Sequence, residues 1–395
     1  NSATLTAKPG QVVTLWGTGL GPISAPDNVP PPAGDLAVPV EILVGGKPAA
    51  KQYSGRTPCC SGVDQIVFRV PADAPPGCFV PVLVRAGGTY SNTVTMSIDP
   101  QGRPCSDPFN VLSPARLGGE KQGMILLLRL SAKAQLEAGQ PPADIVVDLG
   151  LGSFAESAAG AASYNPILSL PPIGSCSVTT QSGVDLGSLL GGQLPGTFSG
   201  GRSLDAGPAL TVTGPAGSKS MPRSDSAYVG FLGGAALLGS SASPLFLAPG
   251  SYQVTGTGGA DVGPFSANVT IPPPVVWTNR DQLTSVNRAQ GLNVAWTGGD
   301  LTGQLALIVG FNVDQQAQAG GLFLCLAPLE AGGFTVPASA LANIPPSNVG
   351  QPDQSFGFLM LGALPHRNIS SFTAAGLDSG FALYLSLDGT TISFQ

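Results

Sequence analysis

The sequence predicts an all-β protein made of several sandwich domains with little helix. Glycine (55) and proline (38) together exceed a fifth of the 395 residues, which is typical of a chain that turns often. Hydrophobic residues make up 43%, enough to bury cores. This argues against disorder, because disordered chains combine low hydrophobicity with high net charge. Short apolar or alternating runs separated by Gly/Pro turns are typical of strands.

The first hundred residues alternate strand and turn in a regular way. Gly45-Gly46 and Gly87-Gly88 each have the composition of a two-residue hairpin turn. About seven strands within 100 residues is the size of an immunoglobulin-like sandwich. The segments expected as strands include residues 12–16, 40–44, 47–53, 64–70, 79–85 and 91–98.

Five sequence blocks in this region carry a resemblance to a known domain. They are W-G-x-G-L-G-P at 16–22, V-G-G-x-x-A at 44–49, D-Q-I-x-F-x-V-P at 64–71, P-x-G at 75–77 and G-G-x-x-S-N-x-V-T at 87–95. Residues of about 5–105 resemble the extracellular domain repeated in secreted acidobacterial proteins of the Solibacter type. That domain is itself similar to IPT/TIG immunoglobulin-like domains. The resemblance implies a β-sandwich fold and export from the cell. It implies no particular activity, because that family has none assigned.

Two further domains are expected after residues 1–105. Residues 106–274 form a β-rich middle domain, with a clearer sandwich from about residue 175 and a possible helical turn or two at 132–138. Pro272-Pro273-Pro274 predicts a stiff linker, because successive prolines favour an extended conformation. Residues 275–395 then form a C-terminal β-sandwich domain with one short helix at 337–343. The strands expected in these domains include 124–130, 144–148, 209–213, 251–254, 267–271, 292–296, 304–310, 321–325 and 381–387.

The six cysteines predict disulfides and an oxidising compartment. Strand 64–70 places Cys59 and Cys60 at one end of the first sandwich and Cys78 at the other. The next strands return Cys105 to the end that holds Cys78, so Cys78–Cys105 is the favoured bridge. Cys59 and Cys60 are left to form a vicinal disulfide or to stay reduced. By elimination Cys176 pairs with Cys325, with buried thiols as the alternative.

Motifs for nucleophilic or phosphate chemistry are weak. The sole histidine, His366, has no G-x-S-x-G elbow beside it and is expected to be a loop residue. Lys219 lies in a hairpin context and lacks the order of a phosphate-binding loop. Gly17 to Gly21 follow a strand, but Pro22 and a proline-rich loop come next, whereas a dinucleotide site needs a helix there. We therefore expect no catalytic residues, no cofactor-binding residues and no metal ligands.

Paired carboxylates are the remaining route to hydrolysis. Asp144 and Asp148 share one face of a predicted strand, and Asp64 and Glu41 could lie on adjacent strands. With 23 acidic residues in the chain, such pairs arise readily without any catalytic role. We expect the protein not to be an enzyme.

Exposed aromatic residues would indicate a sugar-binding module. Trp16, Trp277 and Trp296 all stand in apolar strand contexts and are expected in the core. The aromatic residues in polar contexts form no cluster in the sequence: Tyr53, Tyr90 and Tyr164.

The charge and hydropathy of the chain argue against two classes of function, nucleic-acid binding and membrane spanning. A net charge of −6 and a pI of about 4.7 argue against nucleic-acid partners, because phosphate binding needs clustered lysine and arginine. The longest uncharged stretch, residues 230–248, is broken by Gly, Ser and Pro, so no membrane span is expected. The first residue is Asn1 and not Met, which fits a signal peptide that has been removed. We predict a non-catalytic structural or adhesive protein, extracellular or on the cell surface, with a surface glycan or protein as its partner. The alternative is a carbohydrate- or peptide-binding module of a larger secreted protein.

Overall fold

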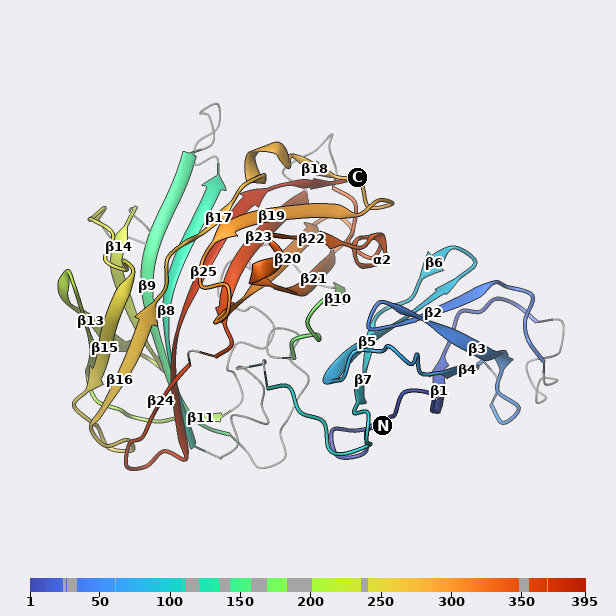
Figure 1. The fold of residues 1–395 in the computed structure, drawn as a ribbon, viewed down its shortest axis with the longest axis horizontal. Coiled ribbons are helices and arrows are strands. Elements are labelled where there is room, and N and C mark those ends of the chain that lie inside the picture. Colours follow the sequence, from blue (N-terminus) through green and yellow to red (C-terminus); the bar gives the residue numbers. More distant parts are fainter. Residues whose placement is uncertain are drawn as a thin grey trace.

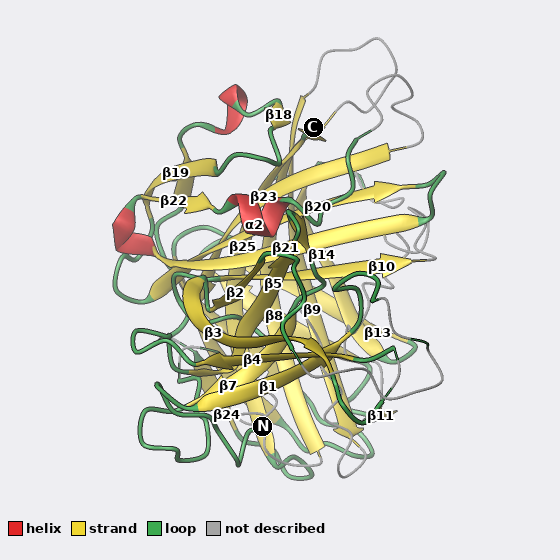
Figure 2. Ribbon diagram, turned by 90° about the vertical axis from the view of Figure 1, so that its right-hand side faces the viewer, coloured by secondary structure: helices red, strands yellow, loops and turns green. Residues whose placement is uncertain are grey.

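The computed structural model describes the chain except for residues 24–25, 27–33, 61, 109, 111–120, 135–142, 158–168, 183–200, 236–240, 348–354 and 368. The protein is all-β with little helix, as predicted (Figures 1 and 2). Within the described residues the helices are α2 (Ala338–Leu341) and the 3-10 turns η1 (Arg280–Gln282) and η2 (Leu329–Ala331). Over those same residues, no helix has both the length and the apolar character needed to cross a membrane.

The N-terminal segment folds into a sandwich of seven strands. Its strands are β1 (Val12–Gly17), β2 (Val40–Val44), β3 (Lys47–Arg56), β4 (Asp64–Arg69), β5 (Gly77–Ala86), β6 (Thr89–Tyr90) and β7 (Val94–Ile98). One sheet has the order β1-β4-β3, and the other joins β2, β5 and β7, with β3 shared between the two. Placing β1 beside β4, and β2 beside β5 and β7, is the strand pairing of immunoglobulin-like sandwiches.

Local sequence explains this sandwich well. Gly45 and Gly46 have φ of 58° and 79°, the left-handed pair that the tight turn from β2 to β3 requires. Along β4, Ile66 and Phe68 face the core while the alternate positions face outward. Strand β3 pairs with β2 up to Ala49 and with β4 from Ala50 onward, and its pairing with β4 has a register shift between Lys51 and Tyr53.

The remaining strands form one continuous 14-stranded sheet and two small sheets. The continuous sheet, here called the central sheet, runs β10-β21-β20-β23-β25-β8-β9-β14-β13-β12-β15-β16, with β11 paired to β9 and β24 to β25. Its strands are β8 (Lys121–Ala134), β9 (Ala143–Ser157), β10 (Cys176–Ser182), β11 (Gly201–Ser203), β12 (Ala209–Gly214), β13 (Gly217–Ser224), β14 (Ala227–Gly234), β15 (Gly250–Gly256), β16 (Phe265–Ile271), β20 (Gln304–Asp314), β21 (Ala319–Pro328), β23 (Ser355–Pro365), β24 (Ser370–Phe372) and β25 (Ser379–Thr391). The small sheets are β17 (Val275–Trp277), β19 (Leu292–Gly298) and β22 (Gly333–Val336), and β18 (Ser285–Val286) with β26 (Ser393–Phe394).

Two hydrophobic cores lie on the same face of the central sheet. In the first core, strands β12, β15 and β16 curl back over β8, β9 and β25, so that Val212 and Val254 pack with Leu127. In the second core, β17, β19 and β22 cover β20, β21 and β23. The opposite face of β20, β21 and β23 carries a smaller cluster that includes Leu170.

The predicted division at Pro274 does not separate two sheets. Strand β8 of the expected middle domain pairs in parallel with β25 of the expected C-terminal domain, and β10 pairs with β21. The Pro272–Pro274 segment crosses between the two cores, joining β16 to β17. The expected boundary at residue 105 falls between the last strand of the first sandwich, β7, which ends at Ile98, and β8, which begins at Lys121.

Other differences from expectation are local. The helix considered at 132–138 is wrong over its first residues, because β8 continues to Ala134 alongside β9; residues 135–138 lie outside the described part. Strand β23 was not predicted, although it pairs with β20 over its whole length. The short helix expected at 337–343 is present as α2, with Pro337 at its N-cap.

The structure contains three disulfides: the Cys78–Cys105 bridge that the strand order predicts, the Cys176–Cys325 bridge expected by elimination, and the vicinal Cys59–Cys60 pair that the sequence left open. Cys78–Cys105 lies at one end of the first sandwich, with the two Cα atoms 5.2 Å apart. Cys59–Cys60 is a vicinal pair in the exposed loop between β3 and β4. Cys176–Cys325 joins β10 directly to the residue opposite it on β21, so it crosslinks neighbouring strands of one sheet and not two separate domains.

Candidate functional site

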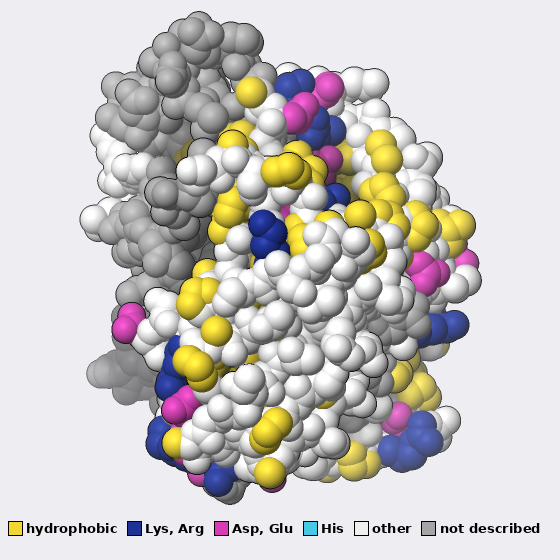
Figure 3. All heavy atoms as spheres, turned by 90° about the vertical axis from the view of Figure 1, so that its left-hand side faces the viewer, with side chains coloured by type: hydrophobic (Ala, Val, Ile, Leu, Met, Phe, Trp, Pro, Cys, Tyr) yellow, Lys and Arg dark blue, Asp and Glu magenta, His cyan; other side chains and the backbone are white. Residues whose placement is uncertain are grey.

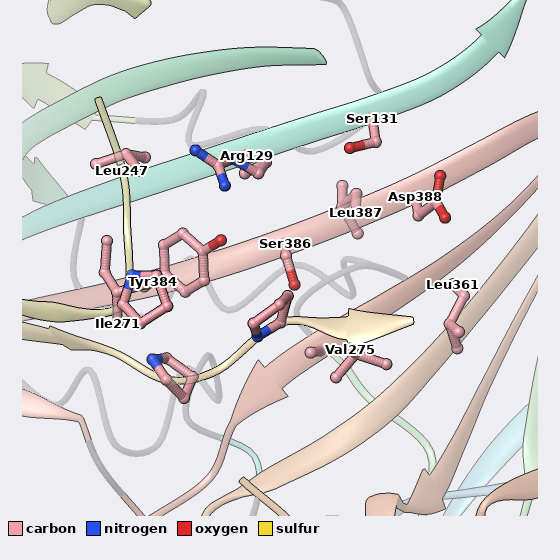
Figure 4. Close-up of a pocket in the computed structure, with 14 residues that line it drawn as sticks. Arg129, Ser131, Leu247, Ile271, Val275, Leu361, Tyr384, Ser386, Leu387 and Asp388 are labelled. Carbon is pink, nitrogen blue, oxygen red and sulfur yellow. The ribbon is translucent and has the colours of Figure 1, made fainter. Parts of the chain in front are cut away.

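The seam between the two cores holds the main group of buried charges. A cavity of about 130 Å³ opens there, floored by β8 and β25 and roofed by the Pro272–Pro274 segment with Leu247 and Val275 (Figure 4). Arg129 and Ser131 of β8, and Tyr384, Ser386 and Asp388 of β25, face this space. These side chains share one face because residues 129 and 386 are register partners, as are 131 and 388.

Arg129 and Asp148 form a bidentate ion pair beside the cavity. They are direct partners across β8 and β9, and two nitrogen–oxygen distances of 2.7 and 2.8 Å join them. The Asp148 side chain is 0% exposed, and its Oδ2 also accepts hydrogen bonds from the backbone amides of Phe246 and Leu247. Burial alone would lower the pKa of Arg129, but the hydrogen bonds and charge of Asp148 more than offset it, so this pKa is raised. The pair thus ties β8, β9 and the chain before β15 together.

Arg280 of η1 joins a second group of charges at the other end of the seam. Its Nη1 lies 2.7 Å from Asp388 of β25, and its Nη2 lies 2.7 Å from Asp144 of β9. Lys133 of β8 pairs with Asp281 at 2.9 Å. Burial raises the pKa of Asp388, and Arg280 offsets only part of that effect. Because β8 lies between β9 and β25, this network spans three adjacent strands.

The cavity itself has little room for a ligand. Burial raises the pKa of Tyr384 to about 12, so its phenol stays protonated at neutral pH. Pockets for drug-sized ligands usually measure about 300–1,000 Å³. A space of about 130 Å³ lined by hydroxyl groups instead suits a few ordered waters. Beside Arg129, the charges and hydroxyls therefore serve mainly to hold strands together, while a more open hollow of about 300 Å³ adjoins them next to Arg280 and Asp388.

The predicted acid pairs are committed to ion pairs. Asp144 and Asp148 do share a face of β9, but each binds an arginine, and Asp144 is 58% exposed while Asp148 is buried. Asp64 and Glu41 are not on adjacent strands, because β3 lies between β4 and β2. Asp64 binds Arg56 and accepts a 2.7 Å hydrogen bond from the amide of Leu20.

The other sequence candidates occupy structural positions. His366 follows β23, and its Nε2 is 3.1 Å from the carbonyl oxygen of Thr302. Lys219 is exposed on β13, beside the turn that joins β12 to β13. Residues 18–20 form a loop after β1, not a helix. No group of three or more His, Cys, Asp or Glu side chains that could hold a metal ion occurs among the described residues.

Trp277 and Trp296 are in the second core, as predicted, and Trp16 is not. The indole nitrogens of Trp277 and Trp296 donate to Asn279 Oδ1 and to the Leu329 carbonyl oxygen at 2.9 and 2.8 Å. Trp16 is 55% exposed, because the alternate residues Val13 and Leu15 of β1 turn toward the core instead. The apolar run around Trp16 hides this alternation in the sequence.

The outward surface of β1, β4 and β3 is a second candidate site, here called the Trp16 face. Trp16 lies opposite Gln65, which in turn lies opposite Gly55. The end of the Tyr53 ring lies over Gly55, where a Cβ atom would come within 2.7 Å of the Tyr53 hydroxyl oxygen, and that hydroxyl donates to the Arg56 carbonyl oxygen at 2.6 Å. Two aromatic side chains therefore flank an amide on one row of the sheet. Of the other tyrosines considered, Tyr90 lies under the Arg85 guanidinium, and Tyr164 is outside the described residues.

Comparison with known proteins adds no identification. No protein-family model matches the chain, and no curated protein matches it. Among solved structures, a titin I9–I11 tandem aligns with 99% of this chain and 96% of its own, at 7% identity and a TM-score of 0.14. A Dpr2 Ig1-Ig2 complex with DIP-Theta aligns over 96% of each chain at 9% identity and a TM-score of 0.13. An endo-fucoidan hydrolase from glycoside hydrolase family 107 aligns with 97% of this chain and 43% of its own, at 12% identity and a TM-score of 0.12.

TM-scores this low carry no argument about fold or function. The class of the protein, an all-β chain with an N-terminal immunoglobulin-like sandwich, instead rests on its own strand pairing. The resemblance of residues 5–105 to the Solibacter-type domain stays a prediction.

We expect Asp148→Asn to lower the free energy of unfolding by about 3 kcal/mol or more, because it leaves Arg129 half-buried without its counter-charge. Asp144→Asn is the matched control on the same strand face and should cost less than about 1 kcal/mol, since the Asp144 carboxylate is exposed. Urea unfolding followed by the fluorescence of the buried tryptophans measures both variants. Similar, small losses in the two variants would show that the Arg129–Asp148 pair does not hold the sheet.

Proposed function

We propose that this chain is a non-catalytic structural or adhesive module of an exported protein. The observation that carries the proposal is the central sheet, which joins strands from residues 121 to 391 into one body and is crosslinked by Cys176–Cys325. A structural or adhesive protein depends on a rigid, continuous sheet that transmits force between its contact surfaces, and it does not depend on a ligand pocket. Figure 3 shows one face of the molecule, where charged side chains are scattered and hydrophobic ones appear singly or in small groups.

Export is supported by the cysteines. All six are paired in the structure, and disulfides persist in oxidising environments outside the cytoplasm.

The seam supports a non-catalytic role. A general acid or base needs a proton to exchange with a substrate. Here Asp148 accepts hydrogen bonds from one guanidinium and two backbone amides, and Asp388 binds Arg280. These carboxylates are engaged within the protein.

We expect cell fractionation of the source organism to find the protein in the surface-wash or medium fractions, with its thiols oxidised. Free thiols would be alkylated before lysis, and non-reduced peptides would then be mapped by mass spectrometry. Recovery in the cytoplasm with alkylated Cys176 and Cys325 would contradict export.

Turnover of model ester, peptide or glycoside substrates that is lost in Asp388→Asn would contradict the non-catalytic part of the proposal.

A carbohydrate- or peptide-binding module is the second candidate, and the Trp16 face favours it. The exposed Trp16 and the partly buried Tyr53 offer large, rigid contact surfaces with a polar edge, and Gln65 between them can both donate and accept hydrogen bonds. The distance across this row is about two strand spacings, roughly 10 Å. That span fits a short stretch of an extended glycan or peptide.

A glycan array probed with the purified chain tests this second candidate. Binding through the Trp16 face should fall by about tenfold or more in Trp16→Ala, as is usual for a central aromatic contact. Leu301→Ala is the control, because Leu301 is a comparably exposed hydrophobic residue in the turn before β20. Binding that survives Trp16→Ala, or that is lost equally in both variants, would remove the Trp16 face as the site.

A further inference from the structure

We propose that the β8–β25 pair is a mechanical clamp, which resists tension applied to the chain before β8 and after β25. The proposal rests on the structural or adhesive function proposed above and gives it a mechanism. Its basis is the parallel direction of these two strands. Tension along the chain reaches β8 at its first residue and β25 at its last residue.

The two strands are parallel neighbours in the middle of the central sheet (Figure 1). Twelve residue pairs join them, from Gln122 with Ser379 to Lys133 with Thr390. At the start of the pair, the Asp378 carboxylate also accepts a 2.8 Å hydrogen bond from the amide of Lys121, a residue 257 positions away in the sequence. The segments that form the two cores lie between these strands in the chain.

Parallel pairing decides how tension acts on the ladder. The chain enters β8 at Lys121 and leaves β25 at Thr391, and these points lie at opposite ends of the pair. At about 3.3 Å per residue, they are separated by roughly 40 Å along the strands. Tension therefore pulls the strands past each other and loads all the ladder hydrogen bonds together. In an antiparallel pair the same two points would lie at one end, and the bonds would break one after another.

Neighbouring strands and side chains oppose this sliding. Strand β8 is also paired with β9 along its whole length, and β25 with β23 over its last part. Arg280 binds Asp388 of β25 and Asp144 of β9, and thereby bridges the strands on both sides of β8. The Arg280 side chain is 16% exposed and that of Asp388 is 27% exposed, so water competes weakly for the contact between these two residues.

The Cys176–Cys325 disulfide limits what is released if the clamp fails. The bridge lies between β8 and β25 in the chain and closes a loop with a sequence separation of 149 residues. That loop cannot extend while the disulfide is intact. At about 3.3–3.6 Å per residue, the loop closed by this disulfide corresponds to roughly 50 nm of extended chain that is not released on unfolding.

Single-molecule stretching of the full chain, held at its two ends, tests the proposal. Reducing the disulfides should lengthen the unfolding event of the central sheet by roughly 50 nm of contour length, which identifies that event. Reduction of Cys78–Cys105 cannot be mistaken for it, because the sequence separation of that pair is only 27. We expect this event at high force. The comparison is the same folded protein held at its N-terminal end and at a cysteine placed by Thr373→Cys, just before β25. There both handles act on one end of the pair, and the unfolding force should fall by about twofold or more because the bonds are loaded singly.

Arg280→Gln should lower the force in the end-to-end geometry. Arg223→Gln is the matched control, because it removes an ion pair with Asp205 outside β8, β9 and β25, and it should leave the force unchanged. Equal forces in the two pulling geometries would overturn the clamp, and so would an event with no gain in length on reduction. A weak clamp in a chain found at the cell surface would overturn this inference alone, whereas a strong clamp in a cytoplasmic chain would overturn the proposed function alone.

Discussion

The parallel pairing of β8 with β25 is the constraint on which the rest of the structure depends. It joins residues 257 positions apart. Closing so long a loop lowers the conformational entropy of the chain, and the contacts of the strands between β8 and β25 are needed to offset that loss. Without it, β8 and β25 would become open edges of two separate sheets, and such edges invite pairing with other chains. The Arg129–Asp148 pair joins β8 to β9, and Arg280 joins β9 to β25 across β8.

This arrangement explains why charges are buried in a chain that has few of them. A buried ion pair contributes little net stability, but removing one partner is costly, so such pairs select one register over others. A slip of one residue between β8 and β9 would turn Arg129 away from Asp148 to the opposite face. The leucine-rich sequence of β8 gives packing without specifying register, and the buried charges supply the specificity.

The sequence predicts best what is encoded locally. The first sandwich could be inferred from glycine pairs and alternating runs, and the Cys78–Cys105 disulfide from strand direction. The fused sheet could not, because residues 124–130 show that a buried strand exists but not which strand lies beside it. The position of Trp16 was missed for a related reason: Val12, Val13 and Leu15 make an apolar run in which the outward positions look like core. Asp144 and Asp148 were placed on one face, but the arginines that bind them come from η1 and from β8, which the sequence does not place beside β9.

The central claim is that residues 121–395 form one cooperative body closed by β8 and β25. Native-state hydrogen exchange measured by mass spectrometry tests this most directly, because it gives the opening free energy of each segment. The account predicts that amides of β8 and β25 exchange together with those of β20 and β15, at the highest opening free energy in the chain. Separate opening of residues 121–271 and 275–395, each with its own free energy, would contradict it.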